Sequence, residues 1–217
     1  MKNLGKLIGI FGGTFDPIHL GHLNLANEVY RHLNLKEISF LPCNQSSIKK
    51  KPVANIADRL AMLELAIRYY PYFNINDCEI KRSGISYTID TLKFLRQEID
   101  SPLCFIMAMD TFAQFNLWHK WQEILTLTHL VIANRPDNLM PTNKEILQLL
   151  NERQSREVKD LQANIAGKIY LINIKPNPIS ATLIRDLIKD GKDASHLLPR
   201  AVWNYIKQHN LYHKSQN

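Results

Sequence analysis

The sequence predicts an α/β protein built on a doubly wound, mostly parallel sheet. Short apolar runs of strand length alternate along the chain with amphipathic stretches of helical period. Parallel strands need long crossover connections, which are usually helices, so this alternation is typical of β-α-β units. The 217 residues contain no internal repeat and no linker-like stretch. We therefore expect one domain, residues 1–217, in which residues from about 180 to 217 form a small helical portion.

Strands are predicted where short runs are rich in Ile, Val, Leu and Phe. The strongest run, LCFIMAM, has seven apolar residues in a row, which suits a buried strand. The predicted strands are Leu7–Phe11, Ile38–Leu41, Phe73–Asp77, Leu103–Met109, Leu130–Ala133 and Ile169–Ile172.

Helices are predicted where apolar residues recur three or four positions apart. The second helix has a clear start signal, because Asn55 can act as its N-cap with Asp58 three residues later. A long loop is expected over Cys43–Ile56, and an exposed helical excursion over Asp137–Ala166. The predicted helices are Leu20–Leu33, Asp58–Tyr70, Thr88–Ile99, Trp121–Leu127, Lys144–Gln154, Ala181–Lys189 and Pro199–His209.

Composition excludes several classes of protein. The chain is 45% hydrophobic and 22% charged, which excludes disorder, collagen and coiled coil for the whole sequence. No apolar run approaches the roughly 20 residues that cross a bilayer, and no signal peptide is expected at the N-terminus. The three cysteines form no C-x-x-C pair, so neither a disulfide framework nor a zinc site is expected. Cys104 is interpreted as a core residue, and the reducing cytoplasm as the compartment.

The charge balance is basic. The chain has 27 Lys and Arg against 20 Asp and Glu, a formal net charge of +7. Such a balance favours nucleotides, phosphorylated metabolites or nucleic acid as partners, although a solvated basic surface explains it equally well. Nucleic-acid signatures are missing and aromatic residues are not interleaved with the basic runs, so a nucleic-acid partner is not expected.

The most informative stretch is Ile10–His22, which reads I-F-G-G-T-F-D-P-I-H-L-G-H. Two glycines at the end of a strand allow main-chain N–H groups to approach a ligand closely, and the following helix N-terminus favours a phosphate. His19 and His22 have the spacing of neighbours on one helical face, so both imidazoles could donate to phosphoryl oxygens. The string is neither a Walker loop nor the dinucleotide fingerprint. The alternative is a tight turn with a capping histidine.

The second motif is Pro178–Arg185, which reads P-I-S-A-T-L-I-R. Ser180 is placed to cap a new helix, Thr182 adds a hydroxyl in its first turn, and Arg185 offers a fork suited to phosphate oxygens. Alone, the pattern is an ordinary helix cap. Together, the two motifs predict a phosphate chain held between two helix ends.

At these residues the sequence resembles the nucleotidyltransferase superfamily whose signatures are H-x-G-H and I-S-x-T-x-x-R, and within it the nicotinate-nucleotide adenylyltransferases. The resemblance extends from roughly Leu7 to Leu211 and implies a Rossmann-like nucleotidyltransferase fold. Further residues in family order are Leu41-Pro42, Arg59, Met62–Ala66, Ser86–Thr88, Asp90–Leu92, Asp110, Trp118, Arg135-Pro136 and Leu197–Pro199.

The resemblance implies transfer of the adenylyl group of ATP to nicotinate mononucleotide, which gives nicotinate adenine dinucleotide and pyrophosphate in NAD biosynthesis. It implies Mg²⁺ carried mainly by the ATP phosphates. The ATP side would comprise Gly12, Gly13, Thr14, Phe15, His19, His22, Ile106, Ser180, Thr182 and Arg185. The mononucleotide side would comprise Thr88, Asp110 and Trp118, with Lys49 and Arg135 as further anion contacts.

Several alternatives stay open. Trp118 could be part of a hydrophobic helix face, and Thr88 and Asp110 could be helix caps. Two departures from the family pattern affect the site: Ile48 stands where many relatives have an imidazole, and Ala108 stands where they usually have glycine. Nicotinamide mononucleotide could be the substrate instead of the acid, and a non-catalytic nucleotide-binding module is the alternative of another class. The sequence leaves a homo-oligomer open.

Overall fold

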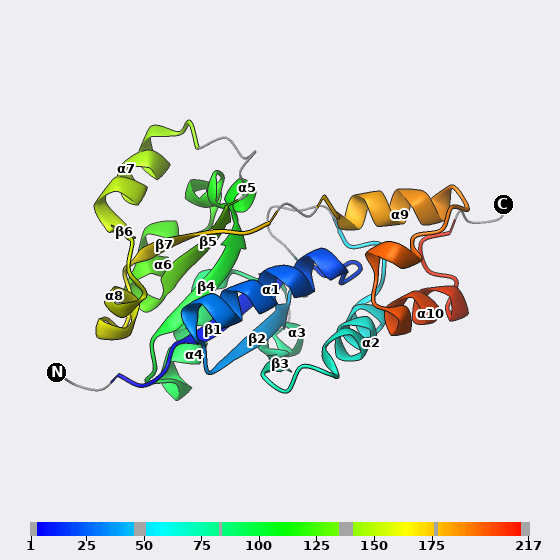
Figure 1. Ribbon diagram of the computed structural model, residues 1–217, viewed down its shortest axis with the longest axis horizontal. Helices are drawn as coiled ribbons and strands as arrows, with labels where there is room; N and C mark the ends of the chain where they lie inside the picture. The colour runs from blue at the N-terminus through cyan, green and yellow to red at the C-terminus, as the bar shows by residue number, and fades with distance from the viewer. Residues whose placement is uncertain (1–3, 46–50, 83, 135–140, 176–177, 214–217) are drawn as a thin grey trace.

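The computed structural model describes residues 4–45, 51–82, 84–134, 141–175 and 178–213. Its centre is a seven-stranded sheet in which every pairing is parallel, in the order β3-β2-β1-β4-β5-β7-β6 (Figure 1). The prediction of a doubly wound α/β fold is therefore confirmed. The strands are β1 Ile8–Gly13, β2 Glu37–Pro42, β3 Phe73–Ile75, β4 Leu103–Ala108, β5 His129–Asn134, β6 Gln154–Ser155 and β7 Ile169–Asn173.

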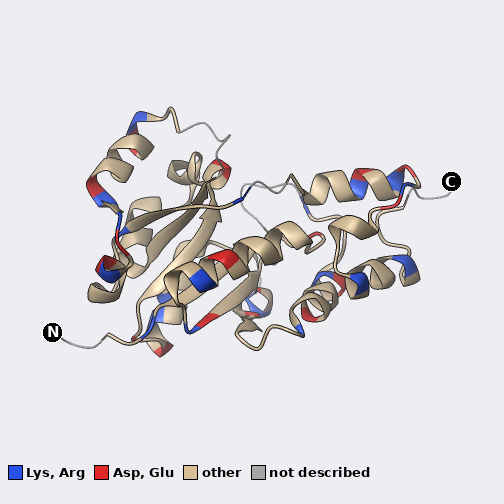
Figure 2. Cartoon of the chain, viewed as in Figure 1, with Lys and Arg blue, Asp and Glu red and all other residues tan. Residues whose placement is uncertain are grey.

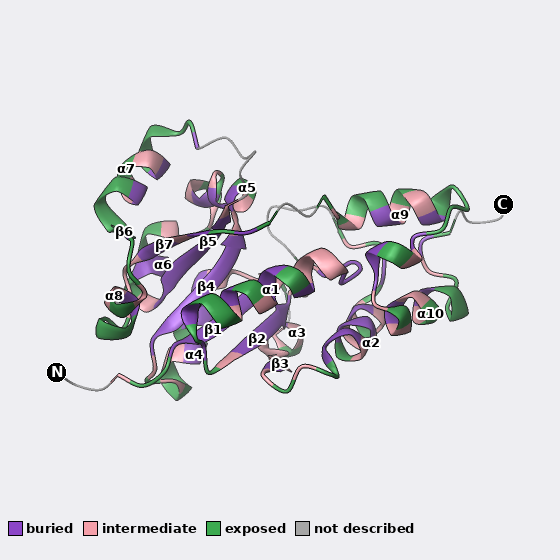
Figure 3. Ribbon diagram, in the orientation of Figure 1, coloured by how far each residue is buried: buried purple, intermediate pink, exposed green. Residues whose placement is uncertain are grey.

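Helices cover both faces of the sheet, because apolar side chains point from the strands in both directions (Figure 3). One buried cluster joins the sheet to α1, and a second joins it to α4, α6 and α7. The helices are α1 Leu20–Leu33, α2 Ile56–Ile67, α3 Cys78–Lys81, α4 Thr88–Glu98, α5 Met109–Phe112, α6 Trp121–Leu127, α7 Lys144–Arg153, α8 Val158–Ala163, α9 Ala181–Lys189 and α10 Arg200–Gln208, with 3₁₀ turns η1 Phe115–Leu117 and η2 Ser195–Leu197.

The predicted strands and helices are all present, and most of them have shifted ends. The helix predicted over Asp58–Tyr70 runs over Ile56–Ile67, and Asn55 caps it by accepting a hydrogen bond from the Asp58 N–H at 2.9 Å. Met109, predicted as the end of a strand, is instead the first residue of α5. The excursion expected over Asp137–Ala166 contains the two-residue strand β6 as well as helices. Short polar elements of this kind carry no periodic signal.

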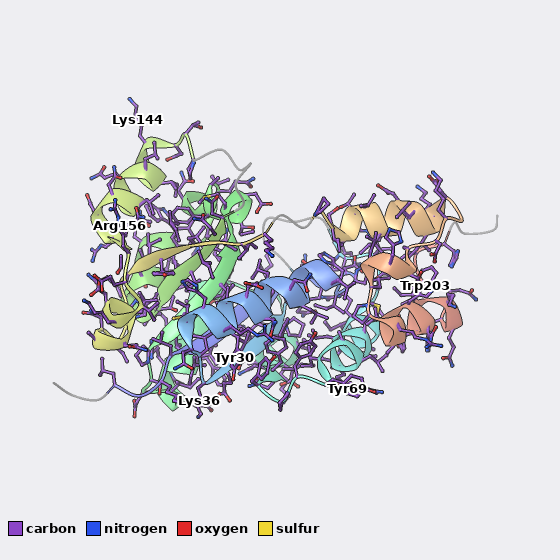
Figure 4. All side chains as sticks on the ribbon, viewed as in Figure 1. Tyr30, Lys36, Tyr69, Lys144, Arg156 and Trp203 are labelled. Atoms are coloured by element: carbon purple, nitrogen blue, oxygen red, sulfur yellow. The ribbon has the colours of Figure 1, made fainter. Side chains whose placement is uncertain are left out.

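The helices α9 and α10 form a block beside α2, away from β6 and α7 (Figure 1). The Tyr205 hydroxyl joins α10 to α2 by donating to Asp58 Oδ1 at 2.9 Å. Ile184 of α9 and Val202 of α10 belong to the same buried cluster as Val29 of α1. This shared core supports the proposal of a single domain. Trp203 of α10, labelled in Figure 4, is partly buried and packs against this cluster.

Acidic and basic residues are intermixed along the surface helices in the view of Figure 2. Cys104 lies on β4 and is fully buried, and burial raises the pKa of its thiol to about 12. Its interpretation as a core residue is therefore confirmed. In the part of the chain that the structure describes, the helices are too short or too polar to cross a membrane.

The burial of His129, the first residue of β5, leads us to expect a lower free energy of unfolding in acid. The side chain is fully buried; its Nδ1 accepts a hydrogen bond from the Lys168 N–H at 3.1 Å, so Nε2 carries the proton and donates to the Asn164 carbonyl at 2.9 Å. Burial lowers the pKa of His129, because a charged ring in the core would be without hydrating water. Its protonated Nδ1 could also no longer accept the hydrogen bond from the Lys168 N–H. Below the ordinary pKa of about 6.5, the unfolded chain binds a proton that the folded chain resists.

The free energy of unfolding should therefore fall as the pH drops through and below that value, and His129→Gln should flatten the fall. Urea denaturation between pH 8 and pH 5 measures the effect. His209→Gln is the matched control, because His209 is exposed at the end of α10. Equal slopes in the wild type and in His129→Gln would contradict the prediction.

Candidate active site

A cleft of about 950 Å³ lies at the carboxyl ends of β1 and β4, the two central neighbours of the sheet. The strand order reverses at this point, which is where open α/β sheets bind ligands. All thirteen predicted site residues within the described part of the chain line this cleft: Gly12, Gly13, Thr14, Phe15, His19, His22, Thr88, Ile106, Asp110, Trp118, Ser180, Thr182 and Arg185. The predictions for Lys49, Ile48 and Arg135 lie outside the described residues.

The loop after β1 requires glycine at its first turn. A Cβ on Gly13 would lie 2.8 Å from the Phe15 ring, closer than side chains tolerate. Phe15 itself has a positive φ of 48°, a conformation that non-glycine residues adopt rarely, and its ring is buried. The chain thus turns sharply from the strand into the loop, and the backbone of Gly12 to Phe15 lines the cleft.

The two histidines are stacked rather than placed side by side along a helix. His19 is the N-cap of α1, outside its first turn, and the ring centroids of His19 and His22 lie 3.7 Å apart with 24° between the planes. The two side chains are therefore neighbours, as their spacing predicted, although His19 precedes the helix instead of lying on its face. Gly21 makes room for the stacking, because a Cβ there would lie 3.0 Å from His19 Nδ1.

The protonation of His22 follows from its backbone contact. The His19 N–H donates to His22 Nδ1 at 3.3 Å. A neutral imidazole has one donor and one acceptor nitrogen, so Nε2 of His22 carries the hydrogen. His22, which lines the cleft, therefore has a donor at Nε2 even when the ring is uncharged.

The second motif starts α9, as predicted. Ser180 caps the helix by accepting a hydrogen bond from the Leu183 N–H at 3.1 Å. The Arg185 guanidinium donates from Nη2 to Thr182 Oγ1 at 3.2 Å and from Nη1 to the Asp16 carbonyl at 2.6 Å. The first contact holds the guanidinium against its own helix, and the second joins that helix to the loop after β1. The amino ends of α1 and α9 therefore meet at one cleft.

Two charged residues that organise the cleft were not selected from the sequence. Asp16 is only 5% exposed, and its carboxylate accepts from the Val53 N–H at 2.7 Å and the Ala54 N–H at 3.1 Å. Arg59 is 2% exposed, and its Nη1 donates to the carbonyls of Thr14 at 2.7 Å and Cys43 at 2.9 Å. The helical period places Arg59 with Met62 and Leu63 on the buried face of α2, and that pattern could have identified it.

The other end of the cleft is aromatic. Trp118 follows η1 and packs edge-on to Phe105 of β4, with ring centroids 5.9 Å apart, so it both joins the core and lines the cleft. Thr88 is the first residue of α4 and Tyr87 is the N-cap, so Thr88 is not a cap. The Asp110 Oδ1 accepts from the Thr111 N–H at 2.9 Å, which supports the first turn of α5.

Some cleft residues carried no signal in the sequence. They come from loops and helix ends with no motif of their own, and they include Lys51, Glu79, Gln114 and His119. The Glu79 carboxylate is buried and accepts from Thr91 Oγ1 at 2.8 Å. Ala108, the departure noted above, ends β4 and also lines the cleft.

The chain belongs to the cytidylyltransferase-like family, because the model of that family matches residues 10–187. It is similar over nearly its whole length to a Coxiella burnetii protein named "Probable nicotinate-nucleotide adenylyltransferase", with 45% identity over 210 residues covering 95% of this chain and 98% of that one. A Methylococcus capsulatus protein of the same name is 40% identical over 210 residues, covering 96% and 100%. The family resemblance stated from the sequence is confirmed.

A solved structure shares the fold. It is described as "Plasmodium falciparum nicotinic acid mononucleotide adenylyltransferase complexed with NaAD" and aligns with a TM-score of 0.75, covering 96% of this chain and 98% of that one. At 21% identity this likeness establishes the architecture.

We expect the hydrogen bonds of Arg59 to contribute to the stability of the fold. Arg59→Met removes the donor of the partly buried Thr14 and Cys43 carbonyls while keeping a long side chain in place. The free energy of unfolding should fall by about 1–3 kcal/mol, the cost of unsatisfied buried groups. Urea denaturation measures it. Arg68→Met, on an exposed residue that follows α2, should stay within about 0.5 kcal/mol of the wild type. Equal effects of the two variants would contradict the role of Arg59.

Proposed function

We propose that the chain is a nicotinate-nucleotide adenylyltransferase, which transfers the adenylyl group of ATP to nicotinate mononucleotide. The observation that carries the proposal is the cleft itself, at which the helix ends of both motifs meet beside an aromatic pocket. Relatives at 40–45% identity, aligned over nearly full length, have names that include this activity. The products are nicotinate adenine dinucleotide and pyrophosphate, in NAD biosynthesis.

The reaction needs alignment rather than an activated nucleophile. A phosphate oxygen of the mononucleotide attacks the α-phosphorus of ATP, a new P–O bond forms, and the bond from that phosphorus to the α,β-bridging oxygen breaks. The electron pair leaves with pyrophosphate. The attacking oxygen is already ionised near neutral pH, so no general base is required. The protein accelerates the step by holding two anions in line and by stabilising charge on the transferred and leaving groups.

The ATP side of the cleft lies between the amino ends of α1 and α9. The backbone of Gly12, Gly13, Thr14 and Phe15 cradles the reacting phosphate, and His22 Nε2 donates to it. The His19 ring stacks on the His22 ring and holds it against the first turn of α1. Ile106 contributes an apolar wall at the end of β4, while Ser180, Thr182 and Arg185 on the α9 side meet the β- and γ-phosphates.

The mononucleotide side lies toward α4 and η1. Trp118, which presents a ring to the cleft, stacks on the pyridine, and Thr88 with nearby backbone N–H groups receives the carboxylate. Asp110 lies at the same end of the sheet. Lys49 and Arg135 remain proposals as anion contacts; Lys51 is a described cation that lines the cleft.

Mg²⁺ fits this cleft as a partner of the ATP phosphates. Two of its carboxylates, Asp16 and Glu79, are buried and already hydrogen-bonded, while Asp110 is exposed. Among the residues that the structure describes, His, Cys, Asp and Glu side chains form no group of three that could enclose a metal. Mg²⁺ commonly binds through substrate phosphates with few protein ligands. When bound, it neutralises phosphate charge.

The test compares two mononucleotides. Purified protein is mixed with ATP and Mg²⁺ and either nicotinate or nicotinamide mononucleotide, and pyrophosphate release is followed. Turnover with the acid at least tenfold above the amide supports the proposal. Preference for the amide would make the protein a nicotinamide mononucleotide adenylyltransferase. ATP binding without pyrophosphate from either substrate would favour the non-catalytic nucleotide-binding module and overturn the proposal.

His22→Ala should lower kcat by on the order of a hundredfold or more, as does loss of one donor to a developing oxyanion. Steady-state kinetics with pyrophosphate release measures it. His32→Ala is the matched control, because His32 lies at the far end of the same helix, with its Nε2 2.8 Å from the Tyr170 hydroxyl. An unchanged kcat in His22→Ala would remove that residue from the mechanism.

A further inference from the structure

The chain returns to the cleft after its last helix. Beyond α10 the backbone reverses, with the Leu211 N–H bonded to the Ile206 carbonyl at 3.0 Å and positive φ angles at Asn210 and Tyr212. Tyr212 is 8% exposed and belongs to the buried cluster that includes Val202 and Ile206. Its hydroxyl lies 2.8 Å from Asp16 Oδ1, although 196 residues separate the two positions.

The direction of this hydrogen bond is clear. Burial, together with the neighbouring charge of Asp16, raises the pKa of Tyr212. The phenol therefore keeps its proton and donates to the carboxylate. The Val53 and Ala54 N–H groups donate to the same carboxylate from the segment that leads into α2.

Asp16 has two different relations with Arg185. Its carbonyl oxygen accepts from Arg185 Nη1 at 2.6 Å, while its carboxylate Oδ2 lies 3.9 Å from the same nitrogen. The guanidinium is thus held at the edge of the cleft by a neutral carbonyl and does not form a close ion pair. A carboxylate that turned toward it would form the stronger, charge-assisted contact.

We propose that Tyr212 is a positioning residue for adenylyl transfer: by occupying the Asp16 carboxylate, it keeps that carboxylate from capturing Arg185 and leaves the guanidinium to the phosphates of ATP. The inference rests on the proposed function for the identity of the ligand. It assigns a role in the site to a residue that touches neither substrate and does not line the cleft.

The first experiment removes the Tyr212 hydroxyl. Tyr212→Phe should raise the KM for ATP at least fivefold and leave the KM for nicotinate mononucleotide within twofold, because Arg185 faces only the ATP phosphates. Tyr205→Phe is the matched control: it also removes a hydroxyl that donates to an aspartate from the C-terminal block, but its partner Asp58 lies outside the cleft. All its constants should stay within twofold. Equal changes in both KM values for Tyr212→Phe would overturn the inference.

The second experiment neutralises the carboxylate. In an Asp16→Asn background the amide cannot form an ion pair with Arg185, so Tyr212→Phe should change the KM for ATP by less than twofold. An increase as large as in the wild-type background would show that Tyr212 acts by another route. If Tyr212→Phe fails to give folded protein by circular dichroism, the hydroxyl is a requirement of stability and the positioning role is wrong.

ATP binding by calorimetry separates this inference from the proposed function. A wild-type protein that binds ATP and releases no pyrophosphate would overturn the proposed reaction. The comparison of Kd for ATP between the wild type and Tyr212→Phe would still test the inference: a Kd at least fivefold weaker supports it, and an unchanged Kd contradicts it.

Discussion

The cleft depends on one buried carboxylate. Asp16 receives donors from the loop before α2 and from Tyr212, and its carbonyl receives Arg185 of α9. A buried carboxylate without such partners would be costly, so these segments must be in place together. Arg59 supplies the opposite charge, and its guanidinium donates to carbonyls in the loops that follow β1 and β2. The two charges hold loops that have little regular structure of their own.

In the proposed reaction, the charges of Asp16 and Arg59 therefore serve as a frame that holds the loops in place. The groups proposed to meet the ligand are main-chain N–H groups, hydroxyls and two stacked imidazoles, together with the Arg185 guanidinium. Donors fixed by such a frame need little reorganisation when charge moves during the reaction. The aromatic side of the cleft is fixed differently, since Trp118 packs on Phe105 and Phe115.

Most of the fold could be predicted from the sequence, because long periodic elements carry their own signal. The bounds of α1, α6 and α9 agree with the prediction to the residue. The same reasoning missed α3 and α5, which have four residues each, and it gave no bounds for α8 within the helical excursion expected over Asp137–Ala166. The proposed ATP side could be predicted because all its residues except Ile106 lie in two continuous strings. Tyr212 could not be identified, because its role depends on a partner 196 residues away along the chain. Arg59 was noted only as a residue in family order, although its place on the buried face of α2 could have marked it. The stacking of the histidines also escaped prediction, because sequence spacing does not determine how the two rings are turned toward each other.

The 196-residue separation between Asp16 and Tyr212 has a consequence for the order of folding. Loop closure over so long a span is entropically unfavourable until much of the chain is already compact. The sheet can assemble from local β-α-β units, but the cleft loop gains its last donor only when the segment after α10 has docked. During synthesis, a nascent chain with all its strands would thus contain both histidines and still lack a finished nucleotide site. Activity should therefore appear later than secondary structure.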